Sequence, residues 1–308
     1  MKKITYAIAL STLMLAGCSQ DEGMMENKGE LVTLNYNVSL GNSVQSRAGE
    51  DLAVNKLLCV IFEKETGTEV KREVVEVTNG TATYTPKLFT NIDYKIVFWA
   101  YYAIDENSCF DLSDVKEIKI NDKFDKDEFV ENKCKDAYTA AHEIKLSKEN
   151  QTPSITLTRP FGMVNVYTSK ADYDAAVAIG STPTSGTITI GNYSKTYNAY
   201  EQKWSTTSDE EITLETNVST TPVQFDGTEY YSLACEYVFA NGTATTNLQI
   251  KDNSTDPKVI YKSSIDNMPI GENARTNLYN PALLTGGGVT YTITINQGFN
   301  ESSEDKHI

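Results

Sequence analysis

Residues 154–167 read SITLTRPFGMVNVY, and in this segment two strand-like runs meet at Arg159-Pro160. Ser154–Thr158 closes one series of such runs, and Met163–Thr168 opens another. Runs of roughly four to eight residues rich in β-branched and aromatic side chains are typical of strands. We therefore predict a division near Arg159. About 110 residues of the strand-rich region lie before this division and about 150 lie after it. Each part is long enough for one β-sandwich.

Alternating patterns extend the strand signal toward both ends of the chain. In Val32–Leu40 and Val289–Ile295 every second residue is apolar, which is the mark of a half-buried strand. Leu57–Phe62 and Tyr94–Tyr102 are almost continuously apolar, as the central strands of a sandwich are. Further strand candidates are Glu69–Val77, Thr81–Thr85, Thr187–Ile190, Glu229–Phe239, Asn247–Ile250 and Val259–Ser264. Many short strands with turn-rich connections predict an all-β fold built from sandwiches.

Helical patterns are scarce in this sequence. Ala171–Ile179 has the composition of a two-turn helix, and its acidic start suits the helix dipole. Asp125–His142 is predicted to hold another short helix within a charged insertion. We expect these two segments to be short helical insertions in a β fold.

The composition excludes several classes of function. The 308 residues include 42 acidic and 27 basic side chains and only two histidines, with a net charge of −15. This charge argues against nucleic-acid binding, which depends on cationic contacts to phosphate. Two histidines leave little for His-based acid–base catalysis or a multi-His metal site. We therefore expect no enzyme and no nucleic-acid partner.

The common catalytic and cofactor motifs are also missing from the sequence. Gly286–Gly288 lacks the lysine of a phosphate-binding loop, and His142-Glu143 lacks the second histidine of a zinc helix. The acidic stretch Asp122–Glu128 lacks the glycine and the terminal glutamate of a calcium loop, so we interpret it as a solvated insertion. The sequence indicates no catalytic residue, no metal site and no cofactor.

The first 18 residues have the pattern of a lipoprotein signal peptide. A basic start, MKK, is followed by an uncharged run at residues 4–15 that is too short to span a bilayer as a helix. Residues 15–18, LAGC, match the bacterial lipobox, in which the cysteine becomes the N-terminus and carries lipid chains such as palmitate. Cys18 is therefore the predicted lipidation site and would anchor the chain in the cell outer membrane. The alternative is an ordinary signal peptide with an incidental cysteine.

The other cysteines divide into two pairs by their surroundings. Cys59 and Cys235 lie in apolar strand runs and are expected to be buried small hydrophobic residues. Cys109 and Cys134 flank the charged insertion, and export from the cytoplasm would permit a disulfide between them. Closing this loop would add roughly 3.5 kcal/mol on the chain-entropy model. Two free thiols are the alternative, and the sequence does not choose between them.

Seven motifs occur in a defined order along the chain. They are LAGC at 15–18, the alternating strand at 32–40, SRAG at 46–49, YKIVFWA at 94–100, DAY at 136–138, ITLTRPF at 155–161 leading into VNV at 164–166, and ARTNLY at 274–279. Together they resemble the fimbrillin-like lipoproteins of Bacteroidales, which are subunits of the type V pilus. The resemblance covers almost the whole chain, and it depends on the order and spacing of motifs that are individually weak.

The resemblance implies two tandem transthyretin-like Greek-key β-sandwich domains, at residues 48–159 and 160–308, behind the lipidated leader. It also implies that a trypsin-like, arginine-specific protease cuts between Arg47 and Ala48. This cut would remove residues 19–47, a tether followed by the first strand. A strand from a neighbouring subunit would then enter the open groove, and residues 289–299 are the expected donor.

The function implied is that of a pilin, a structural subunit of a cell-surface fimbria that supports adhesion. Its partners would be other pilin subunits in a homo- or heteropolymer, the processing protease and the outer membrane. Physically, a missing strand leaves unpaired backbone and an apolar trough, and a foreign strand with the same alternation restores both. In the simpler alternative, both strands pair within their own chain and Arg47 is an ordinary loop arginine.

Two other functions remain open at this stage. The first is a monomeric surface lipoprotein that binds glycans for a nutrient-uptake system, which requires an exposed aromatic platform. The 18 tyrosines could supply one, although most lie in strand patterns that β-propensity explains. The second is a secreted hydrolase, for which abundant carboxylates are the only support.

Overall fold

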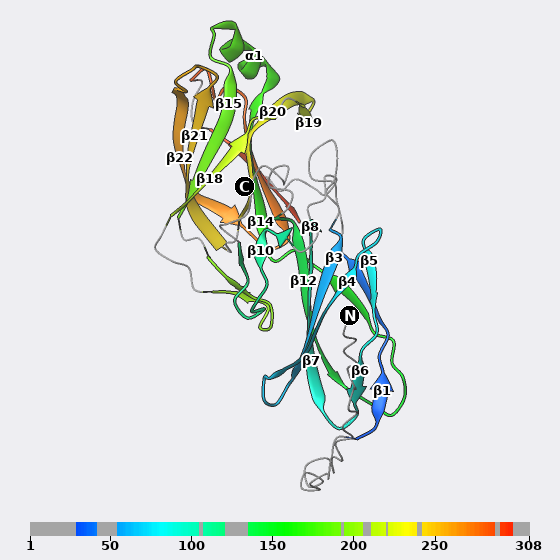
Figure 1. Ribbon diagram of the computed structural model, residues 1–308. Helices are drawn as coiled ribbons and strands as arrows, with labels where there is room; N and C mark the ends of the chain where they lie inside the picture. The colour runs from blue at the N-terminus through cyan, green and yellow to red at the C-terminus, as the bar shows by residue number, and fades with distance from the viewer. Residues whose placement is uncertain are drawn as a thin grey trace, which may run out of the picture.

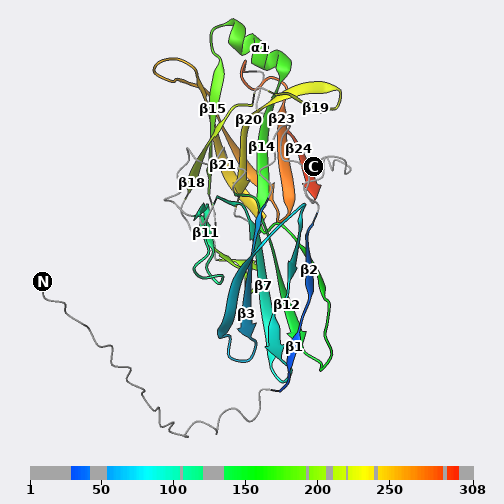
Figure 2. The same ribbon diagram turned by 45° about the vertical axis from the view of Figure 1, so that its right-hand side comes forward.

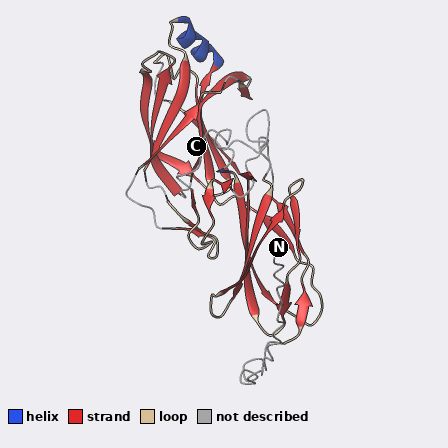
Figure 3. Cartoon of the chain, in the orientation of Figure 1, coloured by secondary structure: helices blue, strands red, loops and turns tan. Residues whose placement is uncertain are grey.

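The computed structural model describes residues 29–41, 54–104, 107–120, 135–191, 194–205, 211–219, 221–238, 242–286 and 290–297. These residues form an all-β structure in which one helix is described, so the predicted fold class is confirmed. Figures 1 and 3 show two groups of strands stacked along the long axis of the molecule, with the helix at the far end of the second group. No helix in the described ranges is long and apolar enough to cross a bilayer.

The first group of strands has two layers. One layer is a four-stranded sheet in the order β12-β7-β3-β4, and the other holds the sheet β13-β2-β5 and the pair β1-β6. Short strands β8 to β11 lie in the long connection between β7 and β12. The strands are β1 (Leu31–Thr33), β2 (Tyr36–Leu40), β3 (Lys56–Glu63), β4 (Glu69–Glu76), β5 (Thr81–Tyr84), β6 (Lys87–Phe89), β7 (Asp93–Tyr101), β8 (Ala103–Ile104), β9 (Asn107–Ser108), β10 (Phe110–Asp111), β11 (Lys119–Ile120), β12 (Ala137–Lys145) and β13 (Ser154–Leu157).

The second group contains a five-stranded sheet, β19-β20-β14-β23-β24, and a four-stranded sheet, β18-β15-β21-β22. In the first of these, β14 and β23 run parallel, with Val166 opposite Leu278. The elements are β14 (Gly162–Ser169), α1 (Lys170–Ala178), β15 (Pro183–Ile190), β16 (Tyr197–Asn198), β17 (Lys203–Trp204), β18 (Ile212–Asn217), β19 (Val223–Phe225), β20 (Thr228–Val238), β21 (Gly242–Asp252), β22 (Val259–Ile270), β23 (Ala274–Asn280) and β24 (Thr292–Gln297).

Strands β3 and β7 contribute side chains to the two larger hydrophobic cores of the described residues. Alternate residues of β3, such as Leu57 and Ile61, face the core between the two layers of the first group. The residues between them, such as Val60, face a second core that continues into the second group through Val164 and Leu278. The almost continuous apolar sequences of β3 and β7 therefore bury both faces of these strands. This shared core joins the two groups rather than leaving them linked by a flexible connection.

A buried ion pair lies where the chain passes from the first group to the second. Arg159 Nε donates to Asp136 Oδ1 at 2.6 Å, and a second guanidinium nitrogen donates to Oδ2 at 2.8 Å. The guanidinium also lies 4.4 Å from the centre of the Tyr138 ring. The Arg159 side chain is 1% exposed, so the bidentate geometry is needed to offset the hydration that its guanidinium loses on burial.

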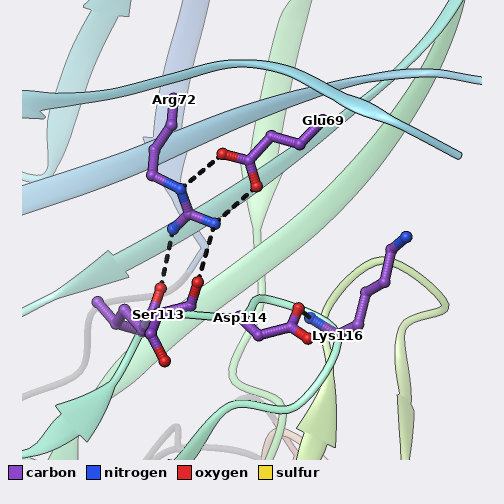
Figure 4. A network of polar contacts seen from close by, with 6 residues as sticks. Glu69, Arg72, Ser113, Asp114 and Lys116 are labelled. Atoms are coloured by element: carbon purple, nitrogen blue, oxygen red, sulfur yellow. Dashed lines mark hydrogen bonds and ion pairs between the residues drawn. The ribbon is translucent and has the colours of Figure 1, made fainter.

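The connection between β7 and β12 contacts the edge of the four-stranded sheet (Figure 4). Arg72 on β4 forms a bidentate pair with Glu69, with both distances 2.8 Å. The same guanidinium donates to the backbone carbonyls of Leu112 and Ser113, at 2.8 and 3.4 Å. Lys116 completes the attachment by donating from Nζ to the carbonyl of Gly67 at 3.0 Å. These contacts hold residues 112–116 against the β3–β4 hairpin.

Most of the strands predicted from the sequence are confirmed, and so is the helix predicted at Ala171–Ile179, which is α1. The short helix predicted within Asp125–His142 does not lie in residues 137–142, because residues from Ala137 onward form β12. Residues 121–134 lie outside the described ranges. Strands β12 and β7 pair along their whole length, so tertiary pairing overrides the helix-forming alanines in this segment. The transthyretin-like topology and the boundary at residue 159 stay predictions.

The ion pair at the joint leads to a stability prediction. Replacing Asp136 by alanine leaves the Arg159 guanidinium buried without this carboxylate, which should lower the free energy of unfolding by about 3–5 kcal/mol. Urea unfolding of purified protein, followed by tryptophan fluorescence, measures this difference.

The control is Glu143→Ala, which removes a 50% exposed carboxylate that pairs with Lys64 at 2.6 Å and with Lys95 at 3.7 Å. This variant should unfold at nearly the same urea concentration as the unaltered chain, because exposed pairs contribute little. Equal midpoints for Asp136→Ala and Glu143→Ala would contradict the structural role of the buried pair.

Candidate functional site

Strand β2 lies between two other strands, and the groove that holds it is the candidate functional site. On one side β2 pairs antiparallel with β5, from Tyr36 opposite Tyr84 to Ser39 opposite Thr81. On the other side it pairs parallel with β13, where Leu40 lies opposite Leu157. Figure 2 shows β1 and β2 following one another along one side of the first group.

Backbone hydrogen bonds beyond the regular ladders hold the same segment. β1 pairs antiparallel with β6, and the residues that join β1 to β2 bond to the chain on either side. Loss of this segment would leave donors and acceptors of both flanking strands without partners. The additional N–H donors and their carbonyl acceptors are Leu34 to Pro86 at 3.0 Å, Asn35 to Gln151 at 2.9 Å, Asn37 to Pro153 at 2.9 Å, Leu40 to Gly80 at 2.9 Å and Gly41 to Leu157 at 2.7 Å.

The side chains of the segment alternate as the sequence predicted. Val32, Leu34, Tyr36 and Val38 are buried in the first core, with exposed fractions of 6%, 0%, 0% and 3%. The intervening residues are exposed or half-buried. The strand therefore closes the core with one face and meets solvent with the other.

Tyr36 contacts the groove through both its ring and its hydroxyl. Its ring contacts Phe98 at 5.3 Å and Tyr84 at 6.4 Å between ring centres. His142 lies edge-on to the same ring at 5.7 Å, and its Nδ1 is 3.1 Å from the Tyr36 hydroxyl. When His142 carries its proton on Nε2, the hydroxyl donates to Nδ1. We name this set, Tyr84, Phe98 and His142 around the ring of Tyr36, the aromatic pocket.

His142 is a functional candidate that the sequence did not identify. It is half-buried on β12, and burial lowers the pKa of its imidazole below the ordinary value of 6.5. Tyr36 and His142 lie 106 residues apart in the chain, and only the pairing of β12 with β7 brings the histidine to this pocket. No local motif could have indicated the contact.

The predicted donor strand lies in the second group, away from this groove. Residues 292–297 form β24, which pairs antiparallel with β23 of the same chain. β24 is the last strand of its sheet, so it has a strand on one side only. In this structure, β2 is the middle strand of one sheet and β24 is the edge strand of another.

The two faces of β24 are not the simple apolar and polar faces that the sequence predicted. Ile293 and Ile295 are only half-buried, whereas Thr294 and Asn296 on the opposite face are buried, at 0% and 6% exposure. The buried hydroxyl of Thr294 has a partner in Asn277 on β23, whose Nδ2 donates to Thr294 Oγ1 at 3.4 Å. The expectation of an outward polar face was therefore wrong for Thr294 and Asn296.

The segment before β24 is fixed to helix α1 by Asp172. This buried carboxylate accepts hydrogen bonds from the backbone N–H groups of Leu284 and Thr285, at 2.6 and 3.0 Å, and from the Thr168 hydroxyl at 2.6 Å. Gly286, which follows, has a positive φ of 81°. Residues up to Thr285 are therefore anchored, and the backbone turns at Gly286 in a conformation that favours glycine.

Four of the predicted site residues lie outside the described ranges. They are Cys18, Arg47, Ala48 and Cys134, so lipidation, processing and the Cys109–Cys134 disulfide stay predictions. Cys109 is buried at 1% exposure. Cys59 and Cys235 are also buried, at 0% and 6%, as the sequence predicted. Within the described ranges, no three His, Cys, Asp or Glu side chains are arranged to hold a metal ion.

Residues 25–307 match the model of a protein family described as a family of unknown function, DUF6562. No curated protein matches the chain in sequence. The match spans nearly the whole chain, including both groups of strands and the groove around β2.

Several solved structures from Bacteroides share the fold. A candidate cell adhesion protein from Bacteroides eggerthii has 14% identity and a TM-score of 0.52, over 87% of this chain and 96% of that one. A candidate adhesin from Bacteroides thetaiotaomicron has 10% identity and a TM-score of 0.51, over 86% and 95%. A candidate polysaccharide-binding protein from the same species has 12% identity and a TM-score of 0.50, over 90% and 98%. These relatives agree with the fimbrillin-like resemblance at the level of the fold.

His142 leads to a prediction about acid stability. Its pKa is lower in the folded chain than in the unfolded chain, so the unfolded chain binds the extra proton more readily. The stabilising effect of neutral His142 is present above pH 6.5 and is lost as the pH falls below that value. The melting temperature of the unaltered chain should therefore fall between pH 7.5 and pH 5.5.

The control is His142→Gln, which keeps a hydrogen-bonding side chain but cannot titrate in this range. Its melting temperature should change less over the same interval, measured by differential scanning calorimetry. Identical pH dependence in the two chains would show that another group is responsible.

Proposed function

We propose, for a chain that belongs to the DUF6562 family of unknown function, a role as a structural subunit of a cell-surface fimbria. In this proposal the subunit polymerises by donor-strand exchange and supports adhesion. It has no catalytic activity and no cofactor. The observation that carries the proposal is the position of β2, which pairs on both sides and closes an apolar core.

The energetic consequence of removing this strand supports the proposal. Four buried apolar side chains, at about 1.5–3 kcal/mol each, contribute about 6–12 kcal/mol to burial. A typical domain is stable by only about 5–15 kcal/mol, so the first group without β1 and β2 would be close to unfolding. A chain processed in this way would bind a replacement strand strongly, because the replacement restores both the ladders and the core.

The character of β24 fits the role of the replacement strand. It is an edge strand paired only with β23, and residues 290–297, TYTITINQ, carry no charge and no proline. Charged residues and prolines usually protect the exposed edge strands of natural sheets, because an unprotected edge pairs with other chains. β24 lacks this protection. Its apolar residues at 291, 293 and 295 repeat the alternation of β2.

Export and processing complete the proposed pathway. The chain would be attached to the outer membrane through lipid on Cys18. A trypsin-like, arginine-specific protease would then cut between Arg47 and Ala48, after β2 and before β3. The cut would separate the anchor and the first strand from the rest of the subunit. The candidate adhesins that share the fold support a location at the cell surface.

Glycan binding by a monomeric surface lipoprotein is the second candidate function. It is favoured by the structural relative described as a candidate polysaccharide-binding protein. Phe225 stacks on Tyr279 at 3.8 Å between ring centres, and Tyr279 stacks on Tyr167 at 4.8 Å. These rings cover one another, and the two tyrosines are 7% and 5% exposed, so they do not form the open platform that sugar stacking needs. An affinity gel with immobilised glycans would test this alternative.

The fimbrial proposal predicts the result of limited proteolysis. Brief trypsin treatment of the exported chain should yield a fragment that begins at Ala48, identified by N-terminal sequencing. The fragment should then form SDS-resistant or filamentous oligomers, observed by gel electrophoresis and electron microscopy.

Arg47→Gln is the matched control, and it should remain monomeric under the same treatment. A fragment that begins at Ala48 and stays monomeric would refute donor-strand exchange. First cleavage at another site would refute Arg47 as the processing site.

A further inference from the structure

We propose that Tyr291 of one copy fills the aromatic pocket that Tyr36 leaves in another copy, and that this side chain sets the register of the incoming strand. The inference rests on the proposed function, because it needs β1 and β2 to be removed and a strand from a second copy to replace them. It goes further by naming the residue that is recognised and the pocket that recognises it.

The aromatic pocket is chemically specific once Tyr36 has left. Phe98, Tyr84 and His142 contact the Tyr36 ring, and Nδ1 of His142, which accepts from the Tyr36 hydroxyl when the imidazole proton is on Nε2, lies 3.1 Å from that hydroxyl. Tyr36 is completely buried, so its removal leaves a space shaped for a flat ring with a hydroxyl at its end. An aliphatic side chain would leave part of this space empty and His142 without a donor, and both are unfavourable.

Tyr291 has the ring and the hydroxyl that the pocket requires. It is the aromatic residue of residues 290–297, and it is half-buried where the chain enters β24. Its hydroxyl lies 3.2 Å from the hydroxyl of Tyr261 on β22. Transfer to the pocket therefore exchanges a bond with a tyrosine hydroxyl for a bond with an imidazole nitrogen. The hydrogen bonding of the side chain is conserved while its ring becomes fully buried.

The spacing of the neighbouring residues supports this register. With Tyr291 at the position of Tyr36, Ile293 and Ile295 fall on the adjacent apolar positions of the groove. These are Val38 and Leu40 for one strand direction, and Leu34 and Val32 for the other. In both cases the polar Gln297 lies beyond the four buried positions.

Other registers fit less well. A shift of two residues places Tyr291 at Leu34 or Val38, where an aromatic ring exceeds the space of a buried aliphatic side chain. Overpacking of this kind costs about 1–3 kcal/mol. A shift that brings Phe299 to the pocket places Gln297 at one of the same two buried positions, where its amide would lose its hydration.

The anchor formed by Asp172 lies before the strand that carries Tyr291. Asp172 holds the backbone at Leu284 and Thr285, so the anchored part of the chain ends before Gly286. Ile293 and Ile295 are only half-buried in the resting position, which limits the cost of withdrawing the strand.

Polymerisation rates of substituted chains after brief trypsin treatment test the proposal. Tyr291→Ala should polymerise at least about tenfold more slowly, because the pocket stays partly empty. Tyr291→Phe, which keeps the ring but leaves His142 without a donor, should be about fivefold slower. Light scattering of freshly cut protein measures these rates.

Two matched controls separate this role from one in the resting fold. Tyr261→Phe removes one resting partner of the Tyr291 hydroxyl, at 3.2 Å, without changing the aromatic pocket, and it should polymerise at least as fast as the unaltered chain. Thr292→Ala changes an exposed side chain on the next residue and should have no effect. Slowing by Tyr261→Phe equal to that by Tyr291→Phe would overturn the proposal.

Photo-crosslinking locates the side chain directly, whatever the rates. In the uncut chain, Tyr291→p-benzoylphenylalanine should crosslink within its own chain near Tyr261. In the polymer, it should crosslink between chains to peptides that contain Tyr84, Phe98 or His142, identified by mass spectrometry. Intermolecular crosslinks to any other part of the chain would overturn the proposed register.

The outcomes distinguish this inference from the proposed function. If the unaltered chain, cut after Arg47, forms no polymer, donor-strand exchange itself fails. If the cut chain polymerises normally but the Tyr291→Ala chain polymerises at the same rate, only the proposed role of Tyr291 fails.

Discussion

The pairing of β2 on both sides is the interaction on which the first group of strands depends. β5 and β13 reach each other only through β2, because neither pairs directly with the other. A buried backbone group without a partner costs about 1–3 kcal/mol, so both flanking strands need β2 or a strand of equal length in its place. The same segment also closes the first core with four buried apolar side chains. Fold and proposed function thus depend on one strand near the start of the described chain.

The second structural constraint is the joint between the two groups. β3 and β7 bury one face in each core, so opening the first core would also disturb the support of the second. The buried Arg159–Asp136 pair fixes the chain where it crosses from one group to the other. A shared core of this kind opposes separation of the two groups, because separation would expose apolar side chains of both.

The sequence was sufficient where local pattern alone determines the structure. The alternation of Val32–Val38 correctly predicted which side chains are buried, and Leu57–Phe62 correctly predicted a strand buried on both faces. It failed where burial depends on a distant partner. The buried hydroxyl of Thr294 has its partner in Asn277, and His142 lies beside Tyr36 because β12 pairs with β7. Arg159 and Asp136 were both noted as motif residues, but their contact follows from the fold and from no spacing in the sequence.

Strand exchange needs a physical reason to proceed in one direction, and the topology supplies one. In its resting position β24 has a neighbouring strand on one side, and its isoleucines are half-buried. In the groove left by β2 it would have neighbours on both sides. Its apolar side chains would occupy the positions of Val32, Leu34 and Tyr36 for one strand direction, all at most 6% exposed in the intact chain, and those of Tyr36, Val38 and the half-buried Leu40 for the other. The transferred strand gives up one ladder and gains two. Since each net hydrogen bond contributes about 0.5–1.5 kcal/mol and further apolar area would be buried, the proposed exchange would be favourable once β2 is gone. While β2 remains in place the groove is full, so in the proposed pathway cleavage rather than strand affinity would control when assembly begins.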